Sequence, residues 1–173
     1  MEQLGQRLRH TLRGRLCIMG VGNVDYGDDG FGVYLAEELA AIGVADVIIA
    51  GTTPERYLGT IAEQGFDHLL VIDAVDFSSE PGSAVFLNAT EIENAYPQIS
   101  THKISLGVLA KVMEEAGTRV WLLGVQPESL RPGQYLTATL QATLEAIHSL
   151  LKQVRLSQAP QHPSSATIQK VLA

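Results

Sequence analysis

A glycine-rich and acidic turn lies near the start of the chain, in the segment Met19-Gly-Val-Gly-Asn-Val-Asp-Tyr-Gly-Asp-Asp-Gly-Phe-Gly-Val33. The apolar run Leu16-Cys-Ile-Met19 precedes it, and Val33-Tyr-Leu-Ala-Glu-Glu-Leu-Ala40 follows it with helical spacing. The order therefore predicts a strand, a turn and a helix. Three aspartates in such a turn indicate a binding role in addition to packing, and the other motifs of the chain indicate which ligand they bind.

Outward from this turn, apolar runs alternate with segments of helical spacing. A short connection without a crossover helix precedes residues 84–88, so that strand is predicted to be antiparallel. We expect a three-layer α/β sandwich, with a mostly parallel five-stranded sheet and helices on both faces. The predicted strands are residues 15–21, 46–50, 68–74, 84–88 and 119–125; the predicted helices are 29–42, 54–64, 104–116 and 137–155; residues 89–101 are expected to be irregular.

With 173 residues, the chain is long enough for a sizeable core. We predict one domain over residues 1–156, with an N-terminal helical extension at 1–14 where Leu4, Leu8 and Leu12 share a helix face. Residues 157–173 are polar and proline-rich, so we expect a flexible tail there.

Charge and composition exclude several function classes. The net charge is −7, which disfavours binding to nucleic acid or to an anionic membrane. No run approaches the ~20 apolar residues of a membrane helix, and the N-terminus does not resemble a secretory signal. The single cysteine, Cys17, lies inside the first apolar run, so no internal disulfide forms. We therefore expect a cytoplasmic protein.

Polar motifs follow four of the predicted strands at the points where those strands end. Gly22 and Asn23 follow the first strand, Gly51 and Thr52 follow the second, and Asp73 ends the third. A Gln-Pro-Glu-Ser block follows the last strand. Because ligands bind beyond the carboxyl ends of strands in such sheets, we expect these motifs to meet at one edge.

His102 is predicted to return to the same edge. The antiparallel strand ends at the opposite edge of the sheet. The next helix has to begin at the carboxyl edge, because the last strand, which follows this helix, begins at the opposite edge. The ~13 intervening residues can span ~40 Å, which is enough to recross the sheet. This brings His102 beside Asp73 and the first turn.

The turn itself fits a cation better than a dinucleotide. Gly20 and Gly22 match the start of a G-x-G-x-x-G motif, but its third glycine position is Asp25. Asp28 and Asp29 then occupy the helix start that a phosphate would need. Together with Asp73 and His102, one of these aspartates would form a mixed oxygen and nitrogen set for a divalent ion such as Zn, Ni, Fe or Mn.

Each of these residues also has a purely structural interpretation. Asp28 or Asp29 could cap the following helix, because aspartate is a favoured N-cap. His102 could likewise be a helix cap. Asp73 ends an apolar strand, where a carboxylate is costly unless it is paired or binds a metal.

Four motifs together resemble one known family, the nickel–iron hydrogenase maturation endopeptidases, and the resemblance extends from about Leu16 to Ile147. The motifs are Gly20-Val-Gly-Asn-x-x-x-Gly-Asp-Asp-Gly-x-Gly32, Asp73-Ala, Thr101-His102 with Leu106 and Gly107, and Gly124-Val-Gln-Pro-Glu-Ser-Leu130.

The resemblance implies an enzyme that removes a C-terminal extension from the hydrogenase large-subunit precursor after nickel insertion, with the maturation chaperone as a second partner. It implies that the nickel is carried by the substrate and contacted by Asp29, Asp73 and His102. The neighbouring Asp28 leaves the choice of the first ligand open. Substrate contacts are expected from the other residues of the edge, which are Gly22, Asn23, Asp28, Gly51 and Thr52.

Two alternatives stay open at this point. One is a metal-dependent hydrolase with a resident ion, and the other is a non-enzymatic, nickel-sensing binding module. The sequence predicts no specific catalytic residue beyond the metal-contacting residues.

Overall fold

A five-stranded sheet with strand order β2-β1-β3-β5-β4 forms the centre of the protein. The structure is a computed structural model that describes residues 1–44, 46–95 and 105–156. Strands β1, β2, β3 and β5 are parallel, and β4 is antiparallel to β5, as predicted. The strands are β1 (Leu16–Val21), β2 (Val47–Gly51), β3 (His68–Ala74), β4 (Ala84–Asn88) and β5 (Arg119–Val125).

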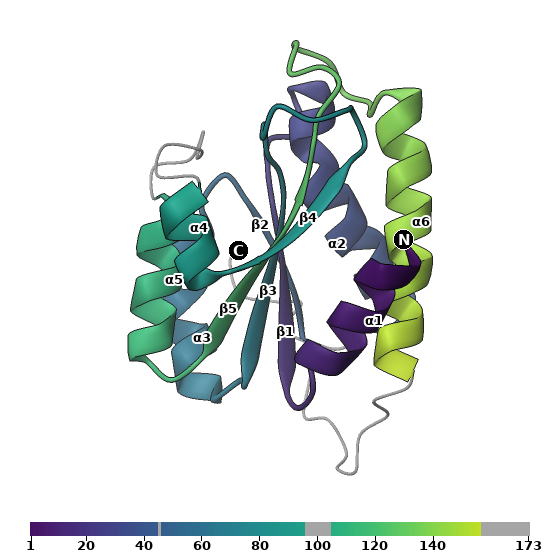
Figure 1. The fold of residues 1–173 in the computed structure, drawn as a ribbon. Coiled ribbons are helices and arrows are strands. Elements are labelled where there is room, and N and C mark those ends of the chain that lie inside the picture. Colours follow the sequence, from purple (N-terminus) through teal and green to yellow (C-terminus); the bar gives the residue numbers. More distant parts are fainter. Residues whose placement is uncertain (45, 96–104, 157–173) are drawn as a thin grey trace.

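Helices cover both faces of the sheet, so the predicted three-layer architecture is confirmed. One layer contains α1, α2 and α6, and the other contains α3, α4 and α5 (Figure 1). The helices are α1 (Glu2–Thr11), α2 (Phe31–Ala41), α3 (Leu58–Gln64), α4 (Ala89–Ala95), α5 (Leu106–Glu115) and α6 (Ala138–Leu156), with short 3₁₀ turns η1 (Gly27–Gly30) and η2 (Pro54–Tyr57).

The alternation of side chains along each strand divides the core in two. Cys17 and Met19 of β1 pack into the cluster with α3 and α5, whereas Leu16 and Ile18 pack into the cluster with α1, α2 and α6. All six residues of β1 are buried, which is typical of a central strand in a sheet covered on both faces.

Two glycines bring α2 unusually close to the sheet. A Cβ atom on Gly20 would collide with the carbonyl oxygen of Gly32, and a Cβ atom on Gly32 would collide with that of Ile72. Because both positions lack a side chain, the start of α2 lies directly against β1 and β3. The turn η1, which precedes α2, is thereby held at the end of the sheet.

The prediction of an irregular segment after β4 was wrong, because α4 begins there at Ala89. Its start is a capping box. The Asn88 side chain accepts a hydrogen bond from the Glu91 N–H (2.9 Å), and the Glu91 side chain accepts one from the Asn88 N–H (2.8 Å). The remainder of the predicted irregular stretch, residues 96–101, lies outside the described residues.

The other boundaries agree with the predictions to within a few residues. Two predicted helices begin with a 3₁₀ turn, η1 or η2, before the α-helix. Helix α1 confirms the predicted N-terminal helix, and Leu8 and Leu12 are fully buried. No helix in the described ranges is long and apolar enough to cross a bilayer. The single-domain division stays a prediction, and the predicted tail lies outside the described residues.

Candidate metal-contacting site at the carboxyl edge

The turn after β1 depends on a glycine in a conformation that other residues rarely adopt. Gly22 has a φ of 141°, and a Cβ atom there would collide with the carbonyl oxygen of Asp29. The Gly22 N–H donates to the carbonyl of Gly51 (3.0 Å), which ties the end of β1 to the end of β2. This N–H is therefore engaged within the fold.

Asp29 lies within this turn with one carboxylate oxygen anchored. Its Oδ2 accepts a hydrogen bond from the Asn23 N–H (3.0 Å), and the residue is 7% exposed. No hydrogen bond to Oδ1 comes from any residue that the structure describes. This hydrogen bond fixes the orientation of the carboxylate.

The neighbouring Asp28 has a different environment. It is fully buried, and its Oδ1 accepts a hydrogen bond from the Thr137 N–H (2.7 Å). Its Oδ2 accepts from the backbone N–H groups of Glu128 and Ser129 (2.9 Å each) and from the Thr137 hydroxyl (3.1 Å). This carboxylate thus joins the first turn to the Gln-Pro-Glu-Ser block and to the start of α6. Substrate contact by Asp28 stays a prediction, and the geometry assigns its carboxylate to the fold.

Asp73 occupies the last but one position of β3, at the same edge. It is 2% exposed and lies in register with Gly124 of β5. One residue earlier, Ile72 pairs with Gly20 of β1, and η1 contacts β3. The structure therefore brings the acidic turn and Asp73 to one end of the sheet, as the strand order requires.

His102, the third predicted ligand, lies outside the described residues, so its position beside Asp73 stays a prediction. Within residues 1–44, 46–95 and 105–156, no three His, Cys, Asp or Glu side chains are arranged to hold a metal ion. Such a set would have to draw on a residue beyond these ranges, and the predicted trio includes one.

Asn23, Gly51 and Thr52 line the ends of β1 and β2. The Asn23 side chain accepts a hydrogen bond from the Asp25 N–H (3.0 Å), and its own N–H is used by Asp29. Thr52 is exposed beyond the end of β2. Their predicted contacts with substrate stay predictions.

Sequence reasoning missed the role of Gln126, which is buried just after β5. Its Oε1 accepts hydrogen bonds from the N–H groups of Phe77 (2.9 Å) and Ser79 (3.2 Å), and its Nε2 donates to Asp76 (3.1 Å). Hydrogen bonds from the Ser78 N–H and from Gln126 lower the pKa of Asp76. Gln126 thereby fixes the loop that follows Asp73. The signal was the position of a polar residue directly after a buried strand.

Glu55 ends the motif that follows the second strand at the same edge, and the sequence analysis gave it no role of its own. It is half-buried, and its Oε2 is enclosed without a hydrogen-bond partner among the described residues. Such groups are rare in folded proteins and are costly to keep.

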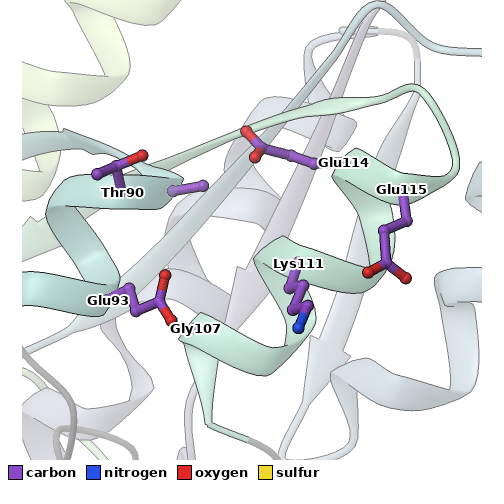
Figure 2. Close-up of a pocket in the computed structure, with 7 residues that line it drawn as sticks. Thr90, Glu93, Gly107, Lys111, Glu114 and Glu115 are labelled. Atoms are coloured by element: carbon purple, nitrogen blue, oxygen red, sulfur yellow. The ribbon is translucent and has the colours of Figure 1, made fainter.

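A groove of about 440 Å³ lies elsewhere, between α4 and α5. Figure 2 shows Glu93 of α4 facing a row of charged side chains on α5. Neither Asp29 nor Asp73 lines it. Its lining residues are Ala89, Thr90, Glu93, Gly107, Lys111, Glu114 and Glu115.

The structure is that of an α/β protein with buried aspartates, Asp29 and Asp73, near the carboxyl ends of its parallel strands. A family model, HycI, described as hydrogenase maturation protease, matches residues 33–154. The match contains Asp73 and His102 and begins just after the turn with Asp28 and Asp29.

Relatives and solved structures agree with the family model. The hydrogenase 2 maturation protease of Escherichia coli is 30% identical over 162 residues, covering 88% of this chain and 98% of the relative. The hydrogenase 3 maturation protease of the same organism is 30% identical over 137 residues, covering 78% and 87%. A crystal structure of the [NiFe] hydrogenase maturation protease HycI from Thermococcus kodakarensis superposes with a TM-score of 0.76 at 28% identity, covering 88% of this chain and 97% of that one.

The chain therefore belongs to the HycI family of hydrogenase maturation proteases, and it is a peptidase.

Proposed function

We propose that this chain is the endopeptidase that removes the C-terminal extension of a nickel–iron hydrogenase large-subunit precursor after nickel insertion. One observation carries the proposal. Asp29 is held at the carboxyl edge by the Asn23 N–H, and no described residue donates to its second oxygen. Membership of the hydrogenase maturation protease family supports the substrate class.

In this proposal, Asp29, Asp73 and His102 contact nickel that arrives as part of the substrate. Two carboxylates and one imidazole are suitable ligands for a borderline divalent ion. Because each ligand comes from a different segment of the chain, the three converge only in the folded protein. The free enzyme is then expected to hold no tightly bound ion of its own.

The chain's own groups orient the reaction. The Asn23 N–H fixes the Asp29 carboxylate, and such supporting hydrogen bonds tune ligand orientation in metal sites. Gly51 and Thr52, beyond the end of β2, are proposed to contact the extended substrate segment together with Asn23. In this proposal, the nickel of the substrate positions the scissile peptide, and it either polarises the carbonyl of that peptide or activates a water molecule.

A covalent thiol mechanism is not part of the proposal. Cys17 is fully buried within β1, several residues before the carboxyl edge. Its thiol faces the core cluster under α3 and α5. An activated nucleophile would have to stand within reach of both a base and the substrate.

The proposed partner is the nickel-bearing precursor, with its maturation chaperone as a second candidate partner, and the proposed compartment is the cytoplasm. The test is to incubate the purified chain with nickel-loaded and with nickel-free precursor and to measure C-terminal shortening by mass spectrometry. Shortening of the nickel-loaded form alone is expected. Cleavage of neither form, or of both equally, contradicts the proposal.

Variants and metal analysis separate this proposal from its alternatives. Asp73→Asn and His102→Ala are expected to abolish processing without unfolding the protein, whereas the exposed α2 variant Glu38→Gln, which removes the same charge elsewhere, is expected to process normally. A stoichiometric ion in the purified free chain would favour the resident-ion hydrolase instead. Nickel binding without any cleavage would favour the sensing module.

A further inference from the structure

Two loops at the carboxyl edge are joined by their backbones. One contains residues 23–27 after β1, and the other contains residues 128–137 after β5. The Gly27 N–H donates to the Gly133 carbonyl (2.7 Å), and the Gly133 N–H donates to the Asp25 carbonyl (2.9 Å). Tyr26 and Gly133 thereby form an isolated parallel bridge. Segments about 100 residues apart in the sequence thus form one continuous rim.

The second loop is held at its ends and near its middle. The Asp28 carboxylate binds the N–H groups of Glu128 and Ser129 at one end and Thr137 at the other. Between these points, the hydroxyl of Tyr34 on α2 donates to the Gln134 carbonyl (2.8 Å). The side chains on this loop are therefore presented by a fixed backbone.

Large apolar side chains gather on this rim and are left open to solvent. Val24 is 36% exposed, Tyr26 is 45%, Leu130 is 44% and Tyr135 is 84%. The rim carries four of the nine exposed large apolar residues in the described ranges. The other five lie in the residue before α1, in the residue after α2, in β2 and, two of them, in α5. Tyrosine on a fixed backbone loses little conformational entropy on binding, and aromatic residues dominate the energetics of protein interfaces.

The rim is continuous with the candidate site. Asp29 follows Tyr26 by three residues, and Asp28, which binds the Ser129 N–H, connects η1 to the residue before Leu130. The apolar residues of the rim therefore adjoin the turn that contains Asp29. Exposed Asp25 and Glu128 flank the apolar residues, with Arg131 as their nearest cation along the chain.

We propose that Val24, Tyr26, Leu130 and Tyr135 form the docking surface for the folded, nickel-bearing precursor. This inference rests on the proposed function and adds where the substrate protein binds. The complementary patch on the precursor is apolar with basic residues at its margin, to match Asp25 and Glu128. Docking there places the metal of the precursor over Asp29 and holds it while the extension is cut.

The test compares two matched pairs of substitutions in steady-state processing of nickel-loaded precursor. The rim variant carries Tyr26→Ser and Tyr135→Ala, and both side chains project into solvent. The control carries Val108→Ala and Val112→Ala, which are 52% and 44% exposed on α5. The rim variant is expected to raise KM about tenfold, the effect of losing a modest interface hot spot, with kcat within about twofold. The control is expected to change neither.

Direct binding distinguishes failure of the docking surface from failure of the proposed function. If the wild-type chain cleaves and the rim variant keeps the wild-type KM and Kd, the docking inference is wrong and the function stands. If the wild-type chain binds precursor without cutting it and the rim variant binds about tenfold more weakly, the surface stands and the function fails. If the wild-type chain does not bind the precursor at all, the inference is overturned.

A second copy of the chain is the competing occupant of the rim. Sedimentation of the free protein at micromolar concentration is expected to give the same state for the wild-type chain and the rim variant. A dimer that the rim substitutions dissociate would assign this surface to self-association and overturn the proposal.

Discussion

The two edges of the sheet treat buried polar groups differently. At the amino edge, Trp121 Nε1 donates to His68 Nδ1, and His68 Nε2 pairs with the Arg13 carbonyl (3.0 Å each). The Thr118 hydroxyl there donates to the Phe66 carbonyl (3.1 Å). Each of these polar groups has a hydrogen-bond partner within the chain, and we call this the closed edge.

At the carboxyl edge, two adjacent aspartates differ in how their carboxylates are hydrogen-bonded. Asp28 is fully satisfied by four hydrogen bonds, like the groups of the closed edge. Asp29 has one oxygen held and the other without a donor among the described residues. The two neighbours therefore differ in how many hydrogen bonds hold them, and this difference underlies the metal-contacting role that we propose for Asp29.

The largest stability effect is expected from Asp28. Asp28→Ala removes the acceptor of four part-buried hydrogen bonds, from the N–H groups of Glu128, Ser129 and Thr137 and from the Thr137 hydroxyl, and each contributes about 1 kcal/mol. The free energy of unfolding in urea is therefore expected to fall by at least about 3 kcal/mol. The matched variant Asp29→Ala loses one hydrogen bond and is expected to cost no more than about 1.5 kcal/mol. Equal losses for the two variants would contradict the division of roles.

The next largest effect is expected from Gly22→Ala. A methyl group at φ 141° meets the Asp29 carbonyl, so we expect a loss of about 1–3 kcal/mol together with slower processing, because Asp29 has to move. The control is Gly117→Ala before β5, which also has a positive φ (92°) but has open space around its Cβ position. This control is expected to cost about 1 kcal/mol and to process normally. Processing by Gly22→Ala at the wild-type rate would show that the turn does not position Asp29.

His68 at the closed edge is expected to make the free energy of unfolding depend on pH. Burial lowers the pKa of His68 below its ordinary value, and the positive charge of Arg119 lowers it further. Below about pH 6.5 the unfolded chain binds more protons than the folded one, so stability is lost as the pH falls toward the lowered pKa. Urea unfolding of the wild-type chain between pH 7.5 and 5 is expected to show this loss, and His68→Gln is expected to reduce it while leaving processing at pH 7.5 unchanged. An identical pH dependence of stability in the wild-type chain and in His68→Gln would refute this role of His68.

The smallest effect is expected where β4 meets α4. Asn88 pairs with Trp121, toward the amino end of β5, and caps α4. Asn88→Ala is expected to lower the free energy of unfolding by about 1 kcal/mol, the usual cost of a lost N-cap, and to leave processing intact. A drop in processing would extend the functional region well beyond the carboxyl edge.

Much of the architecture could be predicted because its signals are local or follow from connectivity. Strands β3, β4 and β5 have the predicted bounds, since each is an apolar run between turn residues. The antiparallel direction of β4 followed from the shortness of the connection before it. Helix α4 was missed even though its Asn88 and Glu91 capping box is visible in the sequence, because seven residues carry little helical periodicity.

The site could be predicted only in part. The convergence of Asp29 and Asp73 follows from the parallel direction of β1 and β3, which the alternation of strands and helices along the sequence indicates. The role of Asp28 does not, because its partners lie 100 to 109 residues away, and only the folded backbone brings them within 3.1 Å. The same holds for Gln126, whose partners belong to the loop after β3.

The most direct test of the central claim is the rate at which Asp29→Asn processes nickel-loaded precursor. This substitution keeps the size of the side chain and removes the charge of the proposed metal-contacting group, so a fall of about 100-fold or more is expected, with urea unfolding close to wild type. Glu38→Gln, measured alongside, is expected to keep the wild-type rate. Processing by Asp29→Asn at the wild-type rate would contradict the proposed role of the open carboxylate.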